Sequence, residues 1–162
     1  MNEKSIVLCI RNASRSQMAK AILNSKAGDR FIAYSAGSRP LEIINPYTIK
    51  VMNEVGVDIS DTKPENIEKY IHEDFDFVIT LCDKMKEECP IFPGNPITAH
   101  WGMDDPDVFV GNEENKLKTF KKTRNEISNR IELFINLTAK KLDRLSLQKG
   151  TREIGNSKAN KL

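Results

Sequence analysis

The sequence predicts an α/β fold of three layers, in which a four-stranded parallel sheet carries helices on both faces. Two observations predict it. Short apolar runs alternate with segments of helical spacing along most of the chain, a pattern typical of parallel sheets with crossover helices. The length of 162 residues suits one domain with a sizeable core. We assign this domain to residues 1–145.

The expected strands are four short apolar runs, namely residues 4–9, 31–36, 75–81 and 98–101. The expected helices are residues 16–26, 46–55, 63–71 and 113–141. Asn45 and Pro46 form a cap and a first helical residue, and Gly56 provides a stop. Residues 146–162 contain little apolar sequence and several Gly and Asn residues, so we expect a disordered tail there.

Composition excludes several classes of protein. The formal net charge of +2 provides no strong field for nucleic acid or membrane surfaces. The polar start and the lack of a long apolar run argue against a signal peptide or membrane span. We therefore expect a cytoplasmic monomer. The chain has 3 cysteines, and an odd number in a reducing compartment is more often catalytic or redox-active than structural.

The most informative segment joins the first expected strand to the first expected helix. Cys9 ends the strand and Arg15 begins the helix. The backbone N–H groups of residues 11–16 can form an anion-binding nest at the helix N-terminus, and the guanidinium fork suits a tetrahedral oxyanion. The same positive field is expected to lower the pKa of Cys9 below the free-thiol value of about 8.5. The alternative is that Cys9 is a small core residue.

The candidate oxyanion-binding residues are Arg11, Asn12, Ala13, Ser14, Arg15 and Ser16. Asn12 tolerates the positive φ that such a nest requires, and a purely geometric role is the one we favour for it. Ser16 can donate a hydrogen bond to the Cys9 thiolate or cap the helix, and both roles can hold at once. Arg11 is expected to face solvent.

Residues 6–19 resemble the active-site loop of low-molecular-weight tyrosine phosphatases and of their arsenate reductase relatives. Three further segments favour the reductases: residues 34–37 (Tyr-Ser-Ala-Gly), 80–82 (Thr-Leu-Cys) and 100–106 (His-Trp-Gly-Met-Asp-Asp-Pro). The resemblance runs in order from about residue 4 to about residue 141. It implies a thioredoxin-coupled arsenate reductase with arsenate or phosphate as the bound oxyanion and no bound cofactor.

The resemblance also implies roles for individual residues. Cys9 would be the nucleophile, and Asp105, the aspartate directly before Pro106, would be the general acid. Without the resemblance, an Asp-Asp-Pro segment is more often a surface Asx-turn. His100 is expected to be a core or hydrogen-bonded residue with no catalytic role.

Cys82 and Cys89 distinguish a reductase from a phosphatase, because a reductase needs a thiol partner for Cys9. Cys82 follows the third strand, so topology places it at the same sheet edge as Cys9. In the implied relay, Cys82 attacks the Cys9–arsenic adduct and Cys89 then carries the disulfide outward to thioredoxin. This requires residues 82–89 to move. The alternative is two unrelated thiols. Their spacing, with no close His, does not suit a zinc site.

Some of the resembling reductases hold a potassium ion behind the loop, partly through an acidic residue at a position that is Lys20 here. A lysine cannot ligate a cation and would repel one, so no metal site is expected. Asn12 and Ser35 remain as possible ligands. Lys20 could replace the ion by pairing with Glu65, or could be a solvated helix residue.

Two rival functions remain open. A low-molecular-weight phosphatase with incidental thiols should show an aromatic wall for a phenyl ring, for which Tyr47 and Phe109 are the candidates. A non-enzymatic oxyanion or metalloid sensor would bind arsenite through its three thiols and turn nothing over.

Overall fold

The sheet has four parallel strands, as the alternating pattern predicts. The computed structural model of the chain describes residues 2–156. The strands are β1 (Glu3–Leu8), β2 (Phe31–Ala36), β3 (Phe77–Thr80) and β4 (Ile97–His100). Their order in the sheet is β2-β1-β3-β4, and each neighbouring pair is parallel. The carboxyl ends of β1 and β3, from which Cys9 and Cys82 follow, are therefore adjacent.

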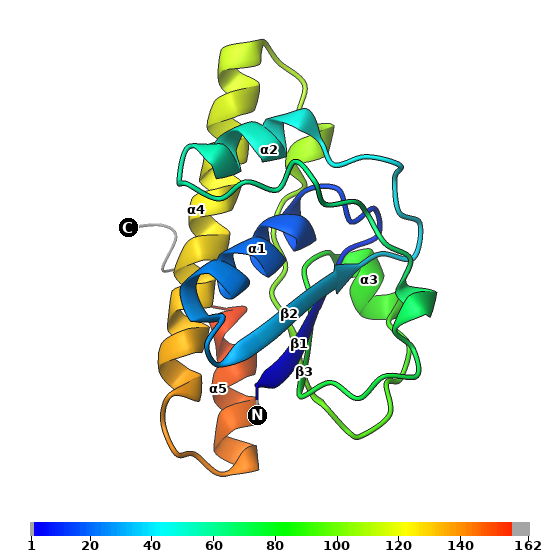
Figure 1. Cartoon of the computed structure of the whole chain (residues 1–162), viewed down its shortest axis with the longest axis vertical. Helices are drawn as coiled ribbons and strands as arrows, with labels where there is room; N and C mark the ends of the chain where they lie inside the picture. The colour runs from blue at the N-terminus through cyan, green and yellow to red at the C-terminus, as the bar shows by residue number, and fades with distance from the viewer. Residues whose placement is uncertain (1, 157–162) are drawn as a thin grey trace.

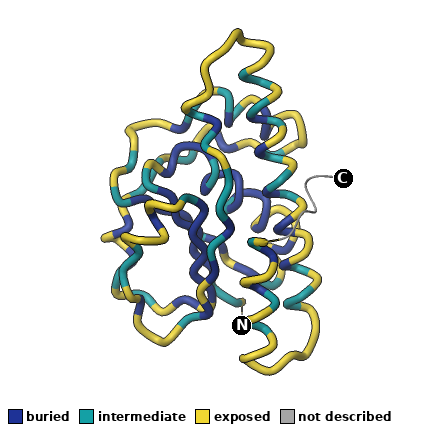
Figure 2. The backbone as a smooth tube through the Cα atoms, turned by 180° about the vertical axis from the view of Figure 1, so that it is seen from behind, coloured by how far each residue is buried: buried dark blue, intermediate teal, exposed yellow. Residues whose placement is uncertain are grey.

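Helices cover both faces of the sheet (Figure 1). They are α1 (Arg15–Ala27), α2 (Pro46–Asn53), α3 (Asp83–Glu88), α4 (Glu113–Thr138) and α5 (Arg144–Ile154), with 3-10 turns η1 (Ile67–Lys69) and η2 (Pro106–Val108). The larger core packs α1, α2, α4 and α5 on one face and includes Phe31, Trp101 and Phe134. The smaller core lies under α3 and η1 and includes Tyr70 and Met85. Figure 2 shows the strands as a buried centre within exposed turns.

Most predicted elements are present with shifted ends. The second strand has the predicted bounds, and the other three strands and the helices α1, α2 and α4 differ at their ends by up to three residues. The predicted helix at residues 63–71 is wrong, because only the three-residue turn η1 forms there. Helix α3 was not predicted from the sequence. It is only 6 residues long and buries a single side chain, Met85, so it leaves no clear helical pattern.

The prediction of a disordered tail from residue 146 is wrong for residues 146–154, which lie in α5. At two glycines of this segment, Gly150 and Gly155, another part of the chain lies so close that a side chain would not fit. A Cβ on Gly150 would lie 2.9 Å from Leu137 of α4, and one on Gly155 would overlap the His100 carbonyl oxygen. Trp101 Nε1 donates to the Thr151 carbonyl at 3.0 Å. These glycines thus let α5 pack against α4 and β4. Residues 157–162 lie outside the described residues.

Candidate active site

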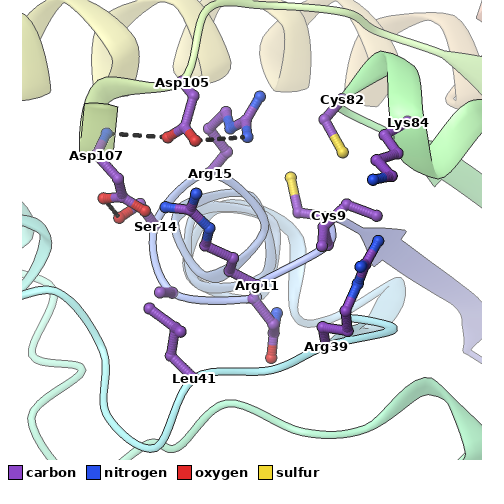
Figure 3. A pocket seen from close by; sticks show the side chains of 13 residues that line it. Cys9, Arg11, Ser14, Arg15, Arg39, Leu41, Cys82, Lys84, Asp105 and Asp107 are labelled. Atoms are coloured by element: carbon purple, nitrogen blue, oxygen red, sulfur yellow. Dashed lines mark hydrogen bonds and ion pairs between the residues drawn. The ribbon is translucent and has the colours of Figure 1, made fainter. Parts of the chain in front are cut away.

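A cavity of about 500 Å³ opens at the carboxyl edge of the sheet, where ligands bind in such folds. Figure 3 shows its side chains, which come from the loop after β1, the segment after β2, the start of α3 and the segment after β4. The residues that line it are Cys9, Ile10, Arg11, Asn12, Ala13, Ser14, Arg15, Arg39, Leu41, Cys82, Lys84, Asp105 and Asp107. The cavity therefore brings together all but two of the predicted site residues, Ser16 and Cys89.

Asn12 shapes the loop from within. Its φ is +52°, the left-handed conformation expected for it, and its side chain is fully buried. Its Oδ1 accepts hydrogen bonds from Gln17 Nε2 and from the Glu65 backbone N–H, both at 2.9 Å, and its Nδ2 donates to Ser16 Oγ at 2.7 Å. Asn12 thus fixes the curvature of the loop beneath the cavity, a geometric role.

The two loop serines point into the protein. Ser16 is fully buried and its described hydrogen bond is to Asn12, with neither Cys9 nor a helix cap as a partner. Ser14 Oγ donates to Asp107 and accepts from Thr48 Oγ1 at 2.9 Å. The predicted interaction of Ser16 with the Cys9 thiolate is therefore not among its described contacts. Ser14 instead ties the loop to η2.

Arg15 and Asp105 lie side by side at the cavity and form an ion pair (Figure 3). The guanidinium lies 3.5 Å from Asp105 Oδ2 and donates to the Met103 carbonyl at 3.0 Å. Asp105 Oδ1 accepts a hydrogen bond from the Asp107 N–H at 2.9 Å. Asp105 therefore also forms the Asx-turn that was the alternative interpretation of this segment. The turn orients one carboxylate oxygen toward the backbone and leaves the other at the cavity, beside the cation that would bind an oxyanion.

The side chains of Cys9 and Cys82 point toward each other in the cavity (Figure 3). Hydrogen-bonding interaction with the Cys82 thiol, together with burial, raises the pKa of Cys9 well above the ordinary thiol value. The same interaction, together with backbone groups of Met85 and Ile10, lowers the pKa of Cys82 to about 5. The expectation of a lowered Cys9 pKa is therefore contradicted, and Cys82 is the thiol of the pair that ionises more readily.

Cys89 lies apart from this pair. It caps the far end of α3 and lines a different cavity. Its Sγ donates to the Pro90 carbonyl at 3.5 Å, and burial raises its pKa to about 11. The nearby Lys84 and Lys86 do not offset this effect of burial, so Cys89 is a protonated thiol while α3 is folded.

Five cavity residues were not predicted as site residues: Ile10, Arg39, Leu41, Lys84 and Asp107. Backbone hydrogen bonds from Arg39 to Ile10 and from Leu41 to Arg11, at 2.9 and 3.0 Å, lay residues 39–41 along the loop. With exposed Arg11 at the mouth, as predicted, these cations make the entrance electropositive. No short-range pattern in the sequence signals this pairing, because it joins segments from different strands.

The cavity has no aromatic wall, since none of the described residues lining it is aromatic. Tyr47 instead stacks on Phe120, with ring centroids 5.4 Å apart. Phe109 is 36% exposed and does not line the cavity. Both candidates for a phenyl-binding surface are therefore located elsewhere.

Lys20 lies behind the loop and is half-buried. Burial lowers its pKa, partly offset by the charge of Glu65. The direct ion pair of Glu65 is with Lys69, at 3.0 Å, so the predicted Lys20–Glu65 pairing is at most a longer-range attraction. Over the described part of the chain, His, Cys, Asp and Glu side chains form no group of three that could hold a metal ion.

His100 is hydrogen-bonded, as predicted. One ring nitrogen lies 2.8 Å from Thr80 Oγ1 and the other 2.9 Å from Asp83 Oδ1. This connects the end of β4 with the first residue of α3, next to Cys82.

None of the helices within residues 2–156 is long and apolar enough to cross a bilayer.

Comparison with known proteins agrees with this geometry. The low molecular weight phosphotyrosine protein phosphatase family matches residues 4–146. An arsenate reductase of Halalkalibacterium halodurans is 39% identical over 135 residues, which are 83% of this chain and 96% of the relative.

Solved structures are similar as well. An arsenate reductase in its phosphate-binding state has a TM-score of 0.66 at 30% identity, over 85% of this chain and 97% of that one. A thioredoxin-dependent arsenate reductase of Corynebacterium glutamicum has a TM-score of 0.57 at 28% identity, over 82% of this chain and 62% of that one. The chain belongs to the low molecular weight phosphotyrosine protein phosphatase family, and within it to the arsenate reductases.

Proposed function

We propose that the protein reduces arsenate to arsenite with electrons from thioredoxin, and that Cys9, Cys82 and Cys89 carry those electrons in turn. The observation that supports this most is that the Cys9 and Cys82 side chains point toward each other inside one cavity with several cationic side chains (Figure 3). A phosphatase needs only a nucleophile, an oxyanion-binding arginine and an acid. A second thiol beside the nucleophile is what formation of a disulfide requires.

In the first step, arsenate binds to Arg15 and the loop amides. Cys9 can pass its proton to the facing Cys82 thiolate, which leaves a Cys9 thiolate to attack arsenic. One arsenate oxygen departs as water after protonation by Asp105. The product is a covalent adduct between Cys9 and arsenic in its pentavalent state.

In the second step, Cys82 loses to water the proton that it received from Cys9, and the resulting thiolate attacks Cys9 Sγ. The sulfur–sulfur bond forms, and the electron pair of the sulfur–arsenic bond stays on arsenic, which leaves as trivalent arsenite. Cys89 then gives its proton to water and attacks Cys82, Cys9 leaves as a thiolate, and a Cys82–Cys89 disulfide remains. These two residues are separated by about 10 Å of helix rise, whereas a disulfide needs Cα atoms within about 7 Å. Helix α3 must therefore unwind.

The test is arsenite production from arsenate with a bacterial thioredoxin, thioredoxin reductase and NADPH, with Cys9→Ser as the inactive control. Many turnovers per chain are expected. Arsenite binding without turnover would favour the sensor, and hydrolysis of p-nitrophenyl phosphate without arsenite production would favour the phosphatase. Either result would overturn the proposal.

A further inference from the structure

Asp107 lines the oxyanion cavity, but the proposed reaction gives it no role. Its negative charge repels an arsenate or phosphate ion bound nearby, so a carboxylate at this place needs a physical reason. Figure 3 shows Asp107 beside Ser14, at the wall of the cavity where Asp105 and Arg15 also lie. The hydrogen bonds of Asp107 provide the reason.

One carboxylate oxygen of Asp107 joins two other segments of the chain. Asp107 Oδ1 accepts hydrogen bonds from Ser14 Oγ at 2.5 Å and from Asn45 Nδ2 at 2.9 Å. Ser14 belongs to the oxyanion-binding loop and is buried, whereas Asn45 is the N-cap residue of α2. Burial raises the pKa of Asp107, and the hydrogen bond from Ser14 opposes this rise. The side chain is therefore an acceptor for two donors of the surrounding fold.

Both donors are themselves held in place. The hydroxyl of Thr48, a fully buried residue of α2, donates to Ser14 Oγ at 2.9 Å. The Asn45 backbone N–H donates to the Ala13 carbonyl at 3.1 Å. The oxyanion-binding loop and the start of α2 thus form one hydrogen-bonded support, and Asp107 attaches η2 to it.

The backbone of Asp107 contacts the proposed acid. Its N–H donates to Asp105 Oδ1 at 2.9 Å, and the ring of Pro106 restricts the backbone between these two residues. A shift of Asp107 would therefore move the Asp105 carboxyl group with it. A general acid must lie within hydrogen-bond reach of the oxygen that it protonates, so the position of Asp107 affects the rate of this step.

We propose that Asp107 is a positioning residue, which holds the Asp105 carboxyl group at the oxyanion cavity by anchoring η2 to Ser14 and Asn45. The proposal rests on the proposed function, in which Asp105 is the acid. The role requires the acceptor oxygen at position 107 and does not require the charge. Asp107→Asn keeps this oxygen, whereas Asp107→Ala removes it but leaves the backbone N–H in place.

The experiment measures, by rapid quench, the rate of the first arsenite release from the reduced protein. Asp107→Ala should be about 10- to 100-fold slower than the wild type, because displacing a reacting group by about 1 Å can cost that much. The arsenate concentration for half-maximal rate should not rise, since Arg15 and the loop amides remain. Asp107→Asn should keep most of the rate. The matched control is Asp104→Ala, an exposed neighbour outside the cavity lining, which should react like the wild type.

A second comparison separates positioning of Asp105 from a general structural effect. If Asp107 acts through Asp105, then Asp107→Ala should slow the reaction in the wild-type background and add no further loss in Asp105→Asn. Equal losses in the two backgrounds would overturn the proposal. An Asp107→Asn variant as slow as Asp107→Ala would also overturn it, because the charge would then be what matters.

Melting temperatures check that each variant is folded. Should Asp107→Ala fail to fold, Ser14→Ala, which removes one of the two donors, takes its place in the same comparison with Asp105→Asn. An unchanged rate in the folded variant would overturn the positioning role while leaving the reductase intact. Absence of arsenite from the wild type would instead overturn the proposed function, and the positioning role with it.

Discussion

The Cys9 and Cys82 side chains point toward each other in the cavity (Figure 3), although one follows β1 and the other follows β3. The two strands are neighbours, with Leu8 paired to Thr80. The interaction between the thiols raises the pKa of Cys9 and lowers that of Cys82, which backbone groups of Met85 and Ile10 lower further. Cys82, the second thiol of the proposed relay, is therefore the more acidic of the two.

The first prediction follows from this difference in pKa. Cys82, with a pKa of about 5, should be alkylated by iodoacetamide at pH 6.5, whereas Cys9, with its raised pKa, should not. Lowering the pH through about 5 should protonate Cys82 and slow its modification. Mass spectrometry of peptides against pH measures both sites. Faster labelling of Cys9 than of Cys82 at pH 6.5 would contradict the assignment.

In Cys82→Ser, the largest cause of the raised Cys9 pKa is removed while Arg15 remains. The pKa of Cys9 should therefore fall relative to the wild type, and Cys9 should become reactive at lower pH. Phosphate, as a bound oxyanion, should slow its alkylation. Unchanged Cys9 reactivity in this variant would show that burial alone, and not Cys82, controls the ionisation.

The second prediction separates the relay thiols. Cys89→Ser should release one equivalent of arsenite per chain and then stop, because the Cys9–Cys82 disulfide can form but cannot be carried outward. Cys82→Ser should release none without an added thiol. Rapid-quench measurement of arsenite gives the stoichiometry. Multiple turnover by Cys82→Ser with thioredoxin alone would rule out the relay.

The third prediction concerns the acid. Asp105→Asn should lower kcat about 100-fold or more, because proton donation of this kind contributes about 10²–10⁴ in rate. The amide oxygen can still accept from the Asp107 N–H, so the turn should persist. Asp104→Asn is the matched control, since Asp104 is exposed and does not line the cavity. Equal losses in both variants would assign the effect to the loop as a whole.

The fourth prediction tests α5 as part of the fold. Ile154 is 6% exposed in the main core, so Ile154→Ala should destabilise the protein by about 2–5 kcal/mol. Leu145→Ala on the same helix removes a side chain that is 80% exposed and should change stability little. Urea unfolding of both variants provides the comparison. Similar, negligible effects would mean that α5 does not contribute to the cooperative unit.

The fifth prediction concerns cations. The half-buried Lys20 ammonium lies behind the loop at the position where some of the resembling reductases have an acidic ligand, so activity should be alike in potassium and sodium salts of equal ionic strength. Melting curves in the two salts should also coincide. A potassium-specific rise in either measurement would show a cation site despite Lys20.

The sequence by itself determined the features that short-range chemistry controls. The parallel sheet follows from the alternation of apolar runs and helical periods. A strand is followed by Cys9, Asn12 and Arg15 and then by a helix, and this order restricts the connecting loop to few conformations. Asn12 adopts the expected positive φ. Topology alone placed Cys82 at the edge shared with Cys9, because parallel neighbours end on the same side.

Only the tertiary structure decided what depends on packing between distant segments. Helices α3 and α5 are too short to be stable alone, and they form because Met85 and Ile154 find buried contacts. Arg39 reaches the cavity because its backbone pairs with Ile10. The low pKa of Cys82 depends in part on the backbone of Met85 and Ile10, which belong to separate segments of the chain. The spacing of residues along the chain cannot predict these contacts, because each contact depends on where a separate helix or strand packs.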